Sequence, residues 1–251
     1  MIHVHVVDSS HTAPHCAHDK RVSCSNCRLN TLCLPISLHI DDIDRLNDIV
    51  QRSKPLQKGE YLYRANDRFL SLFAIRSGAV KAITLSDHGE EQVTGFYLPG
   101  EVVGMEGLAD ERYTNSVIAL ETASICEIPF HRVEELSTRI PSLQRYLFQL
   151  MSREINHDQQ IITLLSKSVA EQRIATLLLS ISTRNQRRRL SATSFSLPMS
   201  RTDIGNFLGL TIETVSRVFT RLQKQGILEV NRKDIMINDV DELRRIANGT
   251  E

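Results

Sequence analysis

Features that would define a membrane protein, a secreted protein or an enzyme are missing from this 251-residue chain. No apolar run approaches the roughly 18 residues that a membrane-spanning helix needs. The first eight residues contain no lysine or arginine ahead of a short apolar stretch, so they are unlike a secretory signal. No G-x-G-x-x-G, P-loop or Ser/His/Asp signature is present. We therefore expect a cytoplasmic protein that is not an enzyme.

Cysteine is scarce and unevenly placed. Three of the five cysteines form a C-x2-C-x5-C run at Cys24, Cys27 and Cys33, Cys126 stands far along the chain, and Cys16 falls outside this spacing. A reducing cytosol disfavours a structural disulfide, so such a run indicates a metal centre or a redox switch. Four thiolates suit either Zn²⁺ or an iron–sulfur cluster. Their spacing leaves both open, with a bare thiol switch as a third alternative.

The chain also lacks a net charge, because 30 basic residues balance 30 acidic ones. This balance hides two opposite parts. Residues 55–130 hold six Lys/Arg and eleven Asp/Glu, whereas residues 170–251 hold thirteen Lys/Arg and nine Asp/Glu. A basic C-terminal part suits a nucleic-acid partner. A chance asymmetry between two domains is the alternative.

The N-terminal half divides into an arm and a strand-rich domain. Five of the nine histidines lie within residues 1–20, without a helical or strand period. We interpret residues 1–23 as a flexible arm, with weak metal binding as the less favoured alternative. Residues 24–140 contain the cysteine segment and then short apolar runs between glycines, which predict a compact β-barrel or roll. The expected strands are Leu70–Ile75, Ala79–Leu85, Gln92–Leu98, Ser116–Leu120 and Ser124–Ile128.

A single long helix is predicted over Pro141–Lys167, which has no glycine and no internal proline. At 1.5 Å per residue its length is about 40 Å, so we expect it to join two domains and to pack against a second copy. A long core helix within one chain is the alternative. Residues 141–168 form this predicted dimerisation helix. Its apolar stripe contains Leu143, Leu147, Met151, Ile155, Ile162 and Leu165, interrupted by Asp158.

Residues 169–251 are predicted to form a domain of short helices. Ser168 and Glu171 predict a capping box for a helix to about Ser182, and the polar, basic residues Thr183–Phe195 are expected to form a loop. A helix-turn-helix follows, with Ser200 and Asp203 capping Ile204–Leu208, a turn at Gly209–Thr211 and a second helix over Ile212–Gln225. Leu228–Val230 and Ile235–Ile237 predict a β-hairpin wing.

The second helix has two distinct faces. Ile212, Val215, Phe219 and Leu222 share an apolar face, and Glu213, Ser216, Arg217 and Thr220 share a polar one. Arg217 can donate to guanine and Glu213 can accept from cytosine, whereas Arg221, Lys224 and Arg201 suit phosphates. A solvated helical face is the alternative. The wing and the local basic charge favour DNA binding.

Several motifs resemble those of the CRP/FNR superfamily of bacterial transcription regulators, within its oxygen-sensing FNR/ANR group. The resemblance extends from Cys24 to about Ala247, and its most specific part is the run from Ile204 to Arg217. It also rests on Cys24–Cys27, Leu32–Pro35, Gly95–Gly100, Cys126–Pro129 and Leu165–Lys167.

The resemblance implies an α+β fold: an N-terminal β-roll sensor domain of the cyclic-nucleotide-binding type, a long dimerisation helix and a C-terminal winged helix-turn-helix. It implies a [4Fe–4S] cluster on Cys24, Cys27, Cys33 and Cys126. Glu213, Ser216 and Arg217 would read a TTGAT-type half-site of a palindrome, and a homodimer would pack through Leu147, Met151, Ile155, Asp158 and Ile162.

Partners also follow from the resemblance. RNA polymerase would be contacted from Asp87–Glu91 and from exposed polar residues around Tyr113–Ser116, although a plain surface turn is an equal alternative. The stretch Arg112–Ser116 lacks the Arg-Ser pair that clamps a nucleotide phosphate in the rival branch, so no cyclic nucleotide is expected.

Asp158 suggests how such a protein is controlled. Two like charges in a partly buried dimer seam repel and lose solvation, so the apo-dimer would be weak and the cluster would supply the missing stabilisation. An aspartate turned to solvent is the alternative. An electron carrier or iron–sulfur oxidoreductase is one rival class, although an electron carrier would not need a recognition helix. A metal-stabilised structural or interaction module is the other, and purification without oxygen would distinguish it.

Overall fold

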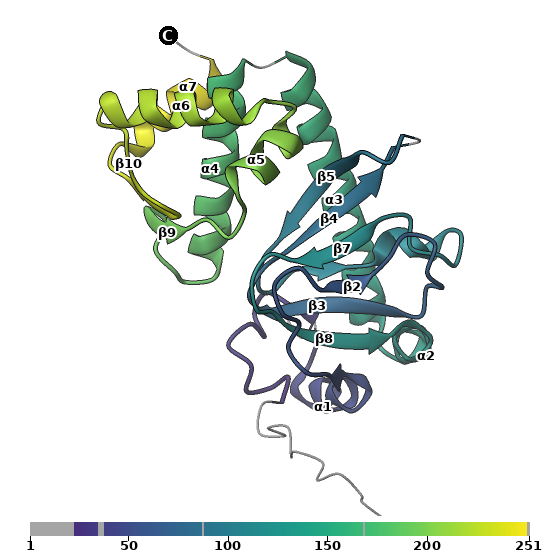
Figure 1. The fold of residues 1–251 in the computed structure, drawn as a ribbon. Coiled ribbons are helices and arrows are strands. Elements are labelled where there is room, and N and C mark those ends of the chain that lie inside the picture. The colour runs from purple at the N-terminus through teal and green to yellow at the C-terminus, as the bar shows by residue number, and fades with distance from the viewer. Residues whose placement is uncertain (1–22, 35–37, 87, 168, 250–251) are drawn as a thin grey trace, which may run out of the picture.

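The computed structural model describes residues 23–34, 38–86, 88–167 and 169–249. Two lobes, one rich in strands and one mainly helical, are joined by a single long helix (Figure 1). The histidine-rich arm, Cys16, Asp87 and Ser168 lie outside the described residues.

The N-terminal lobe is a roll of two four-stranded antiparallel sheets, in which the strand orders are β1-β8-β3-β6 and β2-β7-β4-β5. The five predicted strands are present, each within two residues of its expected ends. The additional strands β1, β2 and β6 span only two or three residues, too few to show a period in sequence. The bounds are β1 Gln51–Arg52, β2 Tyr61–Tyr63, β3 Ser71–Ser77, β4 Val80–Leu85, β5 Glu91–Tyr97, β6 Val102–Val103, β7 Ser116–Ala119 and β8 Ser124–Pro129.

Three short helices accompany the roll: α1 (Ile40–Ile49), the 3-10 helix η2 (Met105–Leu108) and α2 (Phe130–Arg139). Leu46 of α1 and Val133 of α2 are almost completely buried in the same apolar core as Leu72 and Ile128 of the sheets. Helices α1 and α2 therefore close one side of the roll beside β8 (Figure 1).

Helix α3 spans Pro141–Lys167, as predicted. Its first turns belong to the roll, because Leu143 and Tyr146 are buried in the roll core. Beyond them, large apolar side chains recur every seven residues and remain exposed: Phe148 is 58% exposed, Ile155 58% and Ile162 66%. A seven-residue apolar repeat is the pattern of a helix that packs against another helix.

Helix α4 (Ala170–Arg187) is longer than predicted. The expected loop over Thr183–Phe195 is wrong in its first five residues, because the buried face of α4 continues through Ser182 to Asn185. The polar composition of residues 183–187 gave no sign in the sequence that this helix face continues. The expected loop is also wrong at Ser194 and Phe195, which belong to strand β9 (Ser194–Ser196). The N-terminal cap also differs from the expected pairing: the Val169 amide donates to Gln172 Oε1 at 2.9 Å.

The helix-turn-helix consists of α5 (Arg201–Leu208) and α6 (Ile212–Lys224), and α7 (Val240–Asn248) packs against α4. Both predicted caps are present: Ser200 Oγ accepts from the Asp203 amide at 3.0 Å, and Thr211 Oγ1 accepts from the Thr214 amide at 3.2 Å. The wing has a third strand beyond the predicted hairpin. Its order is β10-β11-β9, with β9 at Ser194–Ser196, β10 at Leu228–Asn231 and β11 at Asp234–Ile237.

The two lobes are bonded to each other along β4, β5 and α5. Lys81 Nζ lies 2.7 Å from Asp203 Oδ1, and Phe96 meets Phe207 edge-on with 5.0 Å between ring centroids. Asn206 accepts from the Val93 amide at 2.5 Å and donates to the Glu91 carbonyl at 2.6 Å. The lobes share one apolar cluster across this contact.

Candidate functional site

Four thiols from distant parts of the chain line one small cavity of about 40 Å³. Cys24, Cys27 and Cys33 lie on the segment that precedes α1, and Cys126 lies on β8. In the sheet, Cys126 is paired with Arg52 of β1 on one side and with Ala74 of β3 on the other. The strand order therefore presents Cys126 to the N-terminal segment.

Local hydrogen bonds and two buried leucines shape the thiol-bearing segment. The Asn30 amide donates to the Cys27 carbonyl at 3.0 Å, and the Cys33 amide donates to the Leu29 carbonyl at 2.9 Å. Leu29 is 6% exposed and Leu34 is 1% exposed. The Cys24 amide donates to Asn47 Oδ1 of α1 at 3.1 Å, which ties the beginning of the segment to that helix.

Two arginines add positive charge to the cavity wall. One guanidinium nitrogen of Arg52 lies 3.8 Å from Cys24 Sγ and 2.8 Å from Asn47 Oδ1. Arg52 Nε is buried and has no hydrogen-bond partner among the described residues. Arg76 lines the same cavity. The site therefore offers sulfur ligands beside cations, a setting that favours an anionic centre.

Burial favours the protonated form of Cys24, Cys33 and Cys126 when nothing is bound to them. It raises the pKa of Cys24 to about 11 and that of Cys33 to about 12, and it raises the pKa of Cys126. Thiolates would form here only as protons are exchanged for a metal centre. Within the described ranges, no three His, Cys, Asp or Glu side chains are already grouped to hold a single metal ion.

The polar face of α6 is exposed, as a recognition helix requires. Glu213, Ser216, Arg217 and Thr220 all lie on the surface. Hydrogen bonds from its own backbone amide and from the Thr211 side chain lower the pKa of Glu213, so this side chain is a carboxylate at neutral pH. The Ser216 and Thr220 hydroxyls donate to carbonyls one turn earlier at 2.8 and 2.9 Å, and Arg217 donates to Thr214 Oγ1 at 3.1 Å.

The residues expected at phosphates have partners within the protein. Arg221 forms an ion pair with Glu171 of α4 at 2.7 Å. The Arg201 guanidinium lies over the Phe219 ring, 3.4 Å from its centroid, and burial lowers the pKa of Arg201. Lys224 is exposed. On the opposite face Val215, Phe219 and Leu222 are buried together with Val218, while Ile212, the first residue of the helix, is 45% exposed.

Helix α3 separates the predicted dimer residues into two groups. Leu147 packs partly against the roll core of its own chain. Met151 is half-buried, whereas Ile155, Asp158 and Ile162 are exposed. Phe148, which sequence reasoning missed, joins this exposed stripe. A seven-residue step from Ile155 would have found it.

The two expected RNA polymerase regions differ in accessibility. Residues 88–91, at the turn between β4 and β5, are exposed. In the second region Thr114 is exposed, whereas Tyr113 and Ser116 are buried, so the expectation of a polar surface there is wrong for these two residues. The Tyr113 ring stacks on Tyr63 with 3.9 Å between centroids, and its hydroxyl donates to the Ser71 carbonyl at 2.7 Å. Aromatic packing inside the roll explains its burial.

Known proteins resemble the chain over both lobes. A Crp-like helix-turn-helix domain matches residues 172–246, and a cyclic nucleotide-binding domain matches residues 53–139. The transcriptional activator protein anr of Pseudomonas aeruginosa is 53% identical over 226 residues, 90% of this chain and 93% of the relative. The fumarate and nitrate reduction regulatory protein of Escherichia coli is 43% identical over 229 residues, 91% and 92% of the two chains.

Among solved structures, FixK2 from Bradyrhizobium japonicum is similar with a TM-score of 0.73 and 29% identity, over 79% of this chain and 97% of that chain. The fold and the exposed recognition helix thus define a DNA-binding transcription regulator and not an enzyme. The chain belongs to the Crp/Fnr family, within its FNR/ANR-type regulators. No helix in the described ranges is long and apolar enough to cross a membrane.

Proposed function

We propose that this chain is an oxygen-responsive transcription regulator whose Cys24, Cys27, Cys33 and Cys126 hold a [4Fe–4S] cluster. The main observation that supports this proposal is that the four thiols line one cavity together with Arg52 and Arg76. Four cysteine ligands are the usual ligand set of such a cluster. When bound, the cluster supplies a redox-active, oxygen-sensitive centre, and the two arginines offset the negative charge of its thiolates.

The cysteine segment is the part of the chain that the cluster would order. Leu32 and Leu34 flank Cys33, and Leu34 is already buried in the roll core. The Tyr146 hydroxyl of α3 donates to the Leu32 carbonyl at 3.2 Å. A change in the segment therefore reaches α3 through one hydrogen bond, at the beginning of the exposed stripe.

The stripe on α3 is the proposed dimer seam. Phe148, Met151, Ile155 and Ile162 would pack across a twofold axis in the manner of a coiled coil. Asp158 would approach its copy there, and repulsion between the two carboxylates would keep the apo-dimer weak. A coupling of about 1–3 kcal/mol between cluster and dimer would shift the equilibrium about 5–150-fold.

The dimer would present two copies of α6 to successive major grooves of a palindrome with TTGAT-type half-sites. Glu213, Ser216 and Arg217 would read bases, and Thr220 would lie beside them. Arg221, Arg201 and Lys224 would bind phosphates, for which Arg221 must leave Glu171 and Arg201 must leave the Phe219 ring. Residues 88–91 are the proposed contact with RNA polymerase. We expect no cyclic-nucleotide ligand, because Arg112–Ser116 lacks an Arg-Ser pair.

Anaerobic purification tests this function directly. We expect brown protein with iron and acid-labile sulfide, dimers in solution, and DNA binding that is lost on exposure to air. Colourless protein that contains zinc, with equal DNA binding in both atmospheres, would instead identify a CRP-like regulator with a structural zinc. Metal-free protein whose DNA binding follows added oxidant would identify a thiol redox switch.

A further inference from the structure

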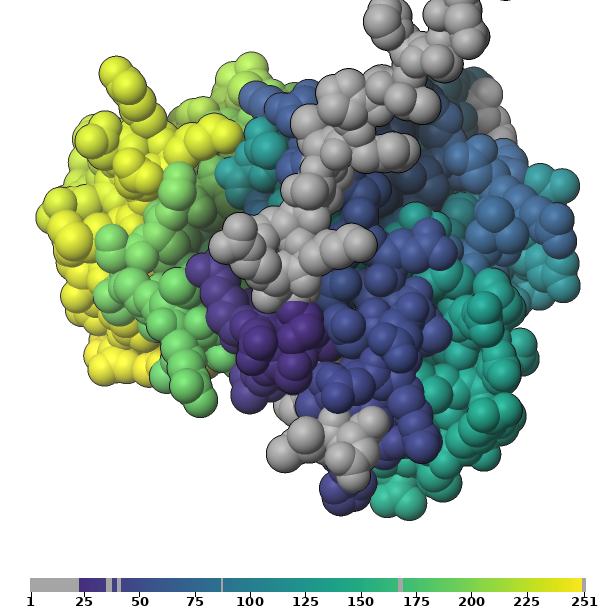
Figure 2. Space-filling view, turned by 90° about the horizontal axis from the view of Figure 1, so that it is seen from below, coloured from purple at the N-terminus to yellow at the C-terminus, as the bar shows by residue number. Residues whose placement is uncertain are grey.

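A groove of about 470 Å³ runs between the cysteine segment and the C-terminal end of α4. One wall is formed by residues 25–32 and Pro99, and the other by residues 187–190. Figure 2 shows the purple cysteine segment beside the green surface of the helical lobe. The groove is large enough for a small organic ligand.

The charge of the groove is entirely positive. Arg28 lines one wall and Arg187, Arg188 and Arg189 line the other, with no acidic side chain among the lining residues. Within the described ranges, none of these four arginines takes part in an ion pair. Arg28, Arg187 and Arg189 are exposed and Arg188 is half-buried, so the groove presents positive charge to solvent from both lobes.

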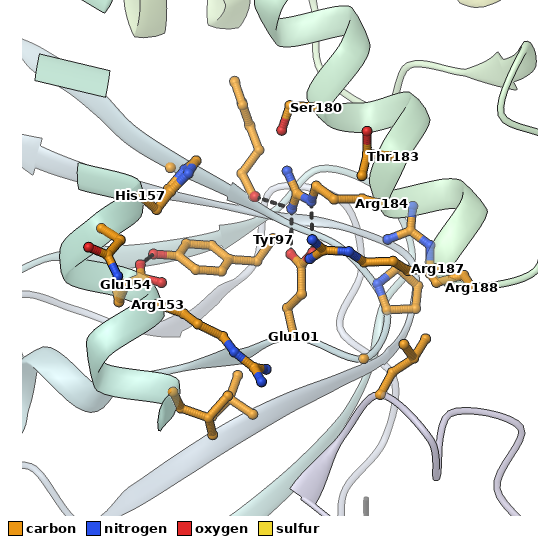
Figure 3. Close-up of a pocket in the computed structure, with 18 of the residues that line it drawn as sticks. Tyr97, Glu101, Arg153, Glu154, His157, Ser180, Thr183, Arg184, Arg187 and Arg188 are labelled. Atoms are coloured by element: carbon orange, nitrogen blue, oxygen red, sulfur yellow. Dashed lines mark hydrogen bonds and ion pairs between the residues drawn. The ribbon is translucent and has the colours of Figure 1, made fainter. Parts of the chain in front are cut away.

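A wider cavity of about 850 Å³ adjoins the groove and shares Arg187 and Arg188 with it (Figure 3). Its acids are already engaged. Glu101 is held by Arg184, with Nε and Oε1 2.7 Å apart, and Glu154 accepts from the Tyr97 hydroxyl at 2.7 Å. Neither carboxylate forms an ion pair with an arginine of the groove.

Arg188 carries an independent sign of a missing partner. Its Nε is buried without a hydrogen-bond partner among the described residues, while its terminal nitrogen donates to Asn185 Oδ1 at 2.5 Å. Burial also lowers the pKa of the Arg188 guanidinium. Arg189 has a φ of 58°, a left-handed backbone conformation unusual for arginine.

Favourable interaction with the helix dipole explains basic residues in the last turn of α4. It does not explain Arg28, which comes from the opposite lobe, nor the buried and unpartnered nitrogen of Arg188. A ligand with several negative charges accounts for both the position of Arg28 and the buried, unpartnered nitrogen of Arg188. Arginine forks bind phosphate oxygens in pairs, so phosphate is the matching chemistry.

We propose that this groove binds an organic polyphosphate, of the nucleoside di- or triphosphate class. The arginines would hold the phosphates, and Leu32, Pro99 and the 57%-exposed Leu190 would contact the apolar part. No aromatic side chain lines the groove, so recognition depends on phosphate number more than on the base. Because Cys27 lines both this groove and the thiol cavity, the ligand would clamp the cysteine segment to the helical lobe of the same chain.

Calorimetric titration of the full-length chain, with its thiols reduced and no cluster loaded, tests the site apart from the cluster. The probes are GTP and inorganic tripolyphosphate. We expect both to bind, and the double variant R187A/R188A to weaken binding at least about tenfold. Absence of binding by both probes overturns the proposal.

A matched control separates a site from general electrostatic attraction. R132A/R139A removes two exposed arginines from α2, where their side chains are 57% and 71% exposed, and should leave the affinity unchanged. An equal loss in both double variants overturns the site. R28A, on the opposite wall, should weaken binding several-fold even if R187A/R188A unfolds; unchanged affinity in R28A removes the cysteine segment from the site and overturns the clamp.

A final arm distinguishes a free ligand from the DNA backbone. A duplex of unrelated sequence should bind R187A/R188A as well as it binds the parent chain, and GTP should not displace it. If duplex and GTP compete and both lose affinity in the variant, the groove is a DNA phosphate contact and the small-ligand proposal fails.

Discussion

The recognition helix and the thiol cavity are built in opposite ways. Helix α6 is local: Thr211 caps its beginning, and its buried and exposed faces follow the helical period within 13 residues. The thiol cavity is assembled, because Cys126 reaches Cys24 only through the pairing of β1, β8 and β3. A helix such as α6 should therefore tolerate the loss of one contact. A site built from distant segments, such as the thiol cavity, should lose its function when one of its residues is removed. The following substitutions test this difference.

The largest effect is expected for Cys27→Ala. With three thiols left in the cavity, we expect acid-labile sulfide to fall to background and anaerobic DNA binding to be lost. Iron and sulfide assays on anaerobically purified protein measure this. Cys16→Ala is the matched control, because Cys16 lies outside the quartet and should retain both metal and binding. Unaltered anaerobic binding by Cys27→Ala would reject the cluster.

Arg217→Ala tests whether α6 reads bases. We expect it to cost about 1–3 kcal/mol of binding and to relax the preference at one base position, because a bidentate contact is lost. Arg221→Ala is the comparison and should weaken binding to all sequences equally. Titration of duplexes with single base changes measures both. A uniform loss in Arg217→Ala would recast Arg217 as a phosphate contact.

Asp158→Ala tests the proposed weakness of the apo-dimer. Removing the repelling carboxylates should produce dimers in air. The free energy of dimerisation should become more favourable by about 1–3 kcal/mol at most. Sedimentation equilibrium under aerobic conditions measures this change. Gln159→Ala, one residue off the stripe, should remain like the parent chain. A fully monomeric Asp158→Ala protein in air would count against repulsion at the seam.

The smallest effect is expected for Ser200→Ala, which removes the cap of α5. The Asp203 amide loses its acceptor, so unfolding free energy should fall by about 1 kcal/mol. Urea denaturation followed by circular dichroism measures the change. Thr202→Ala is a suitable control, because Thr202 is exposed and no cap depends on it. Because alanine has the higher helix propensity, an equal loss in both variants would show that the lost free energy does not come from the cap.

Sequence reasoning succeeded where the determinants were local. The strands, helix α3 and the two caps of the helix-turn-helix follow from period and from single polar residues such as Ser200 and Thr211. Sequence-based prediction failed where contacts with distant parts of the chain determine the secondary structure. Helix α4 continues to Arg187 because Asn185 is buried by tertiary packing, and β9 forms because β11 offers it an edge.

The candidate sites show the same division. Spacing and resemblance predict the residues of the thiol quartet. Arg52, which lies opposite Cys126 on the neighbouring strand, has no signal in the sequence. Leu147 and Phe148 are neighbours in one helix, and only the packing of α3 on the roll determines which of them faces outward. The arginine groove likewise depends on the tertiary fold, because Arg28 and Arg187 line it from the two different lobes.

The bonds from Asn206 to β5 bear on how this regulator can be engineered. Because Asn206 and Asp203 bond α5 to β5 and β4 of the strand-rich lobe, the helical lobe cannot be exchanged without loss of these contacts. A chimera that takes its helical lobe from a distant relative would lose these bonds and expose the Phe96–Phe207 contact to solvent. Transferring β4 and β5 together with the helical lobe would keep the contact between the two lobes intact.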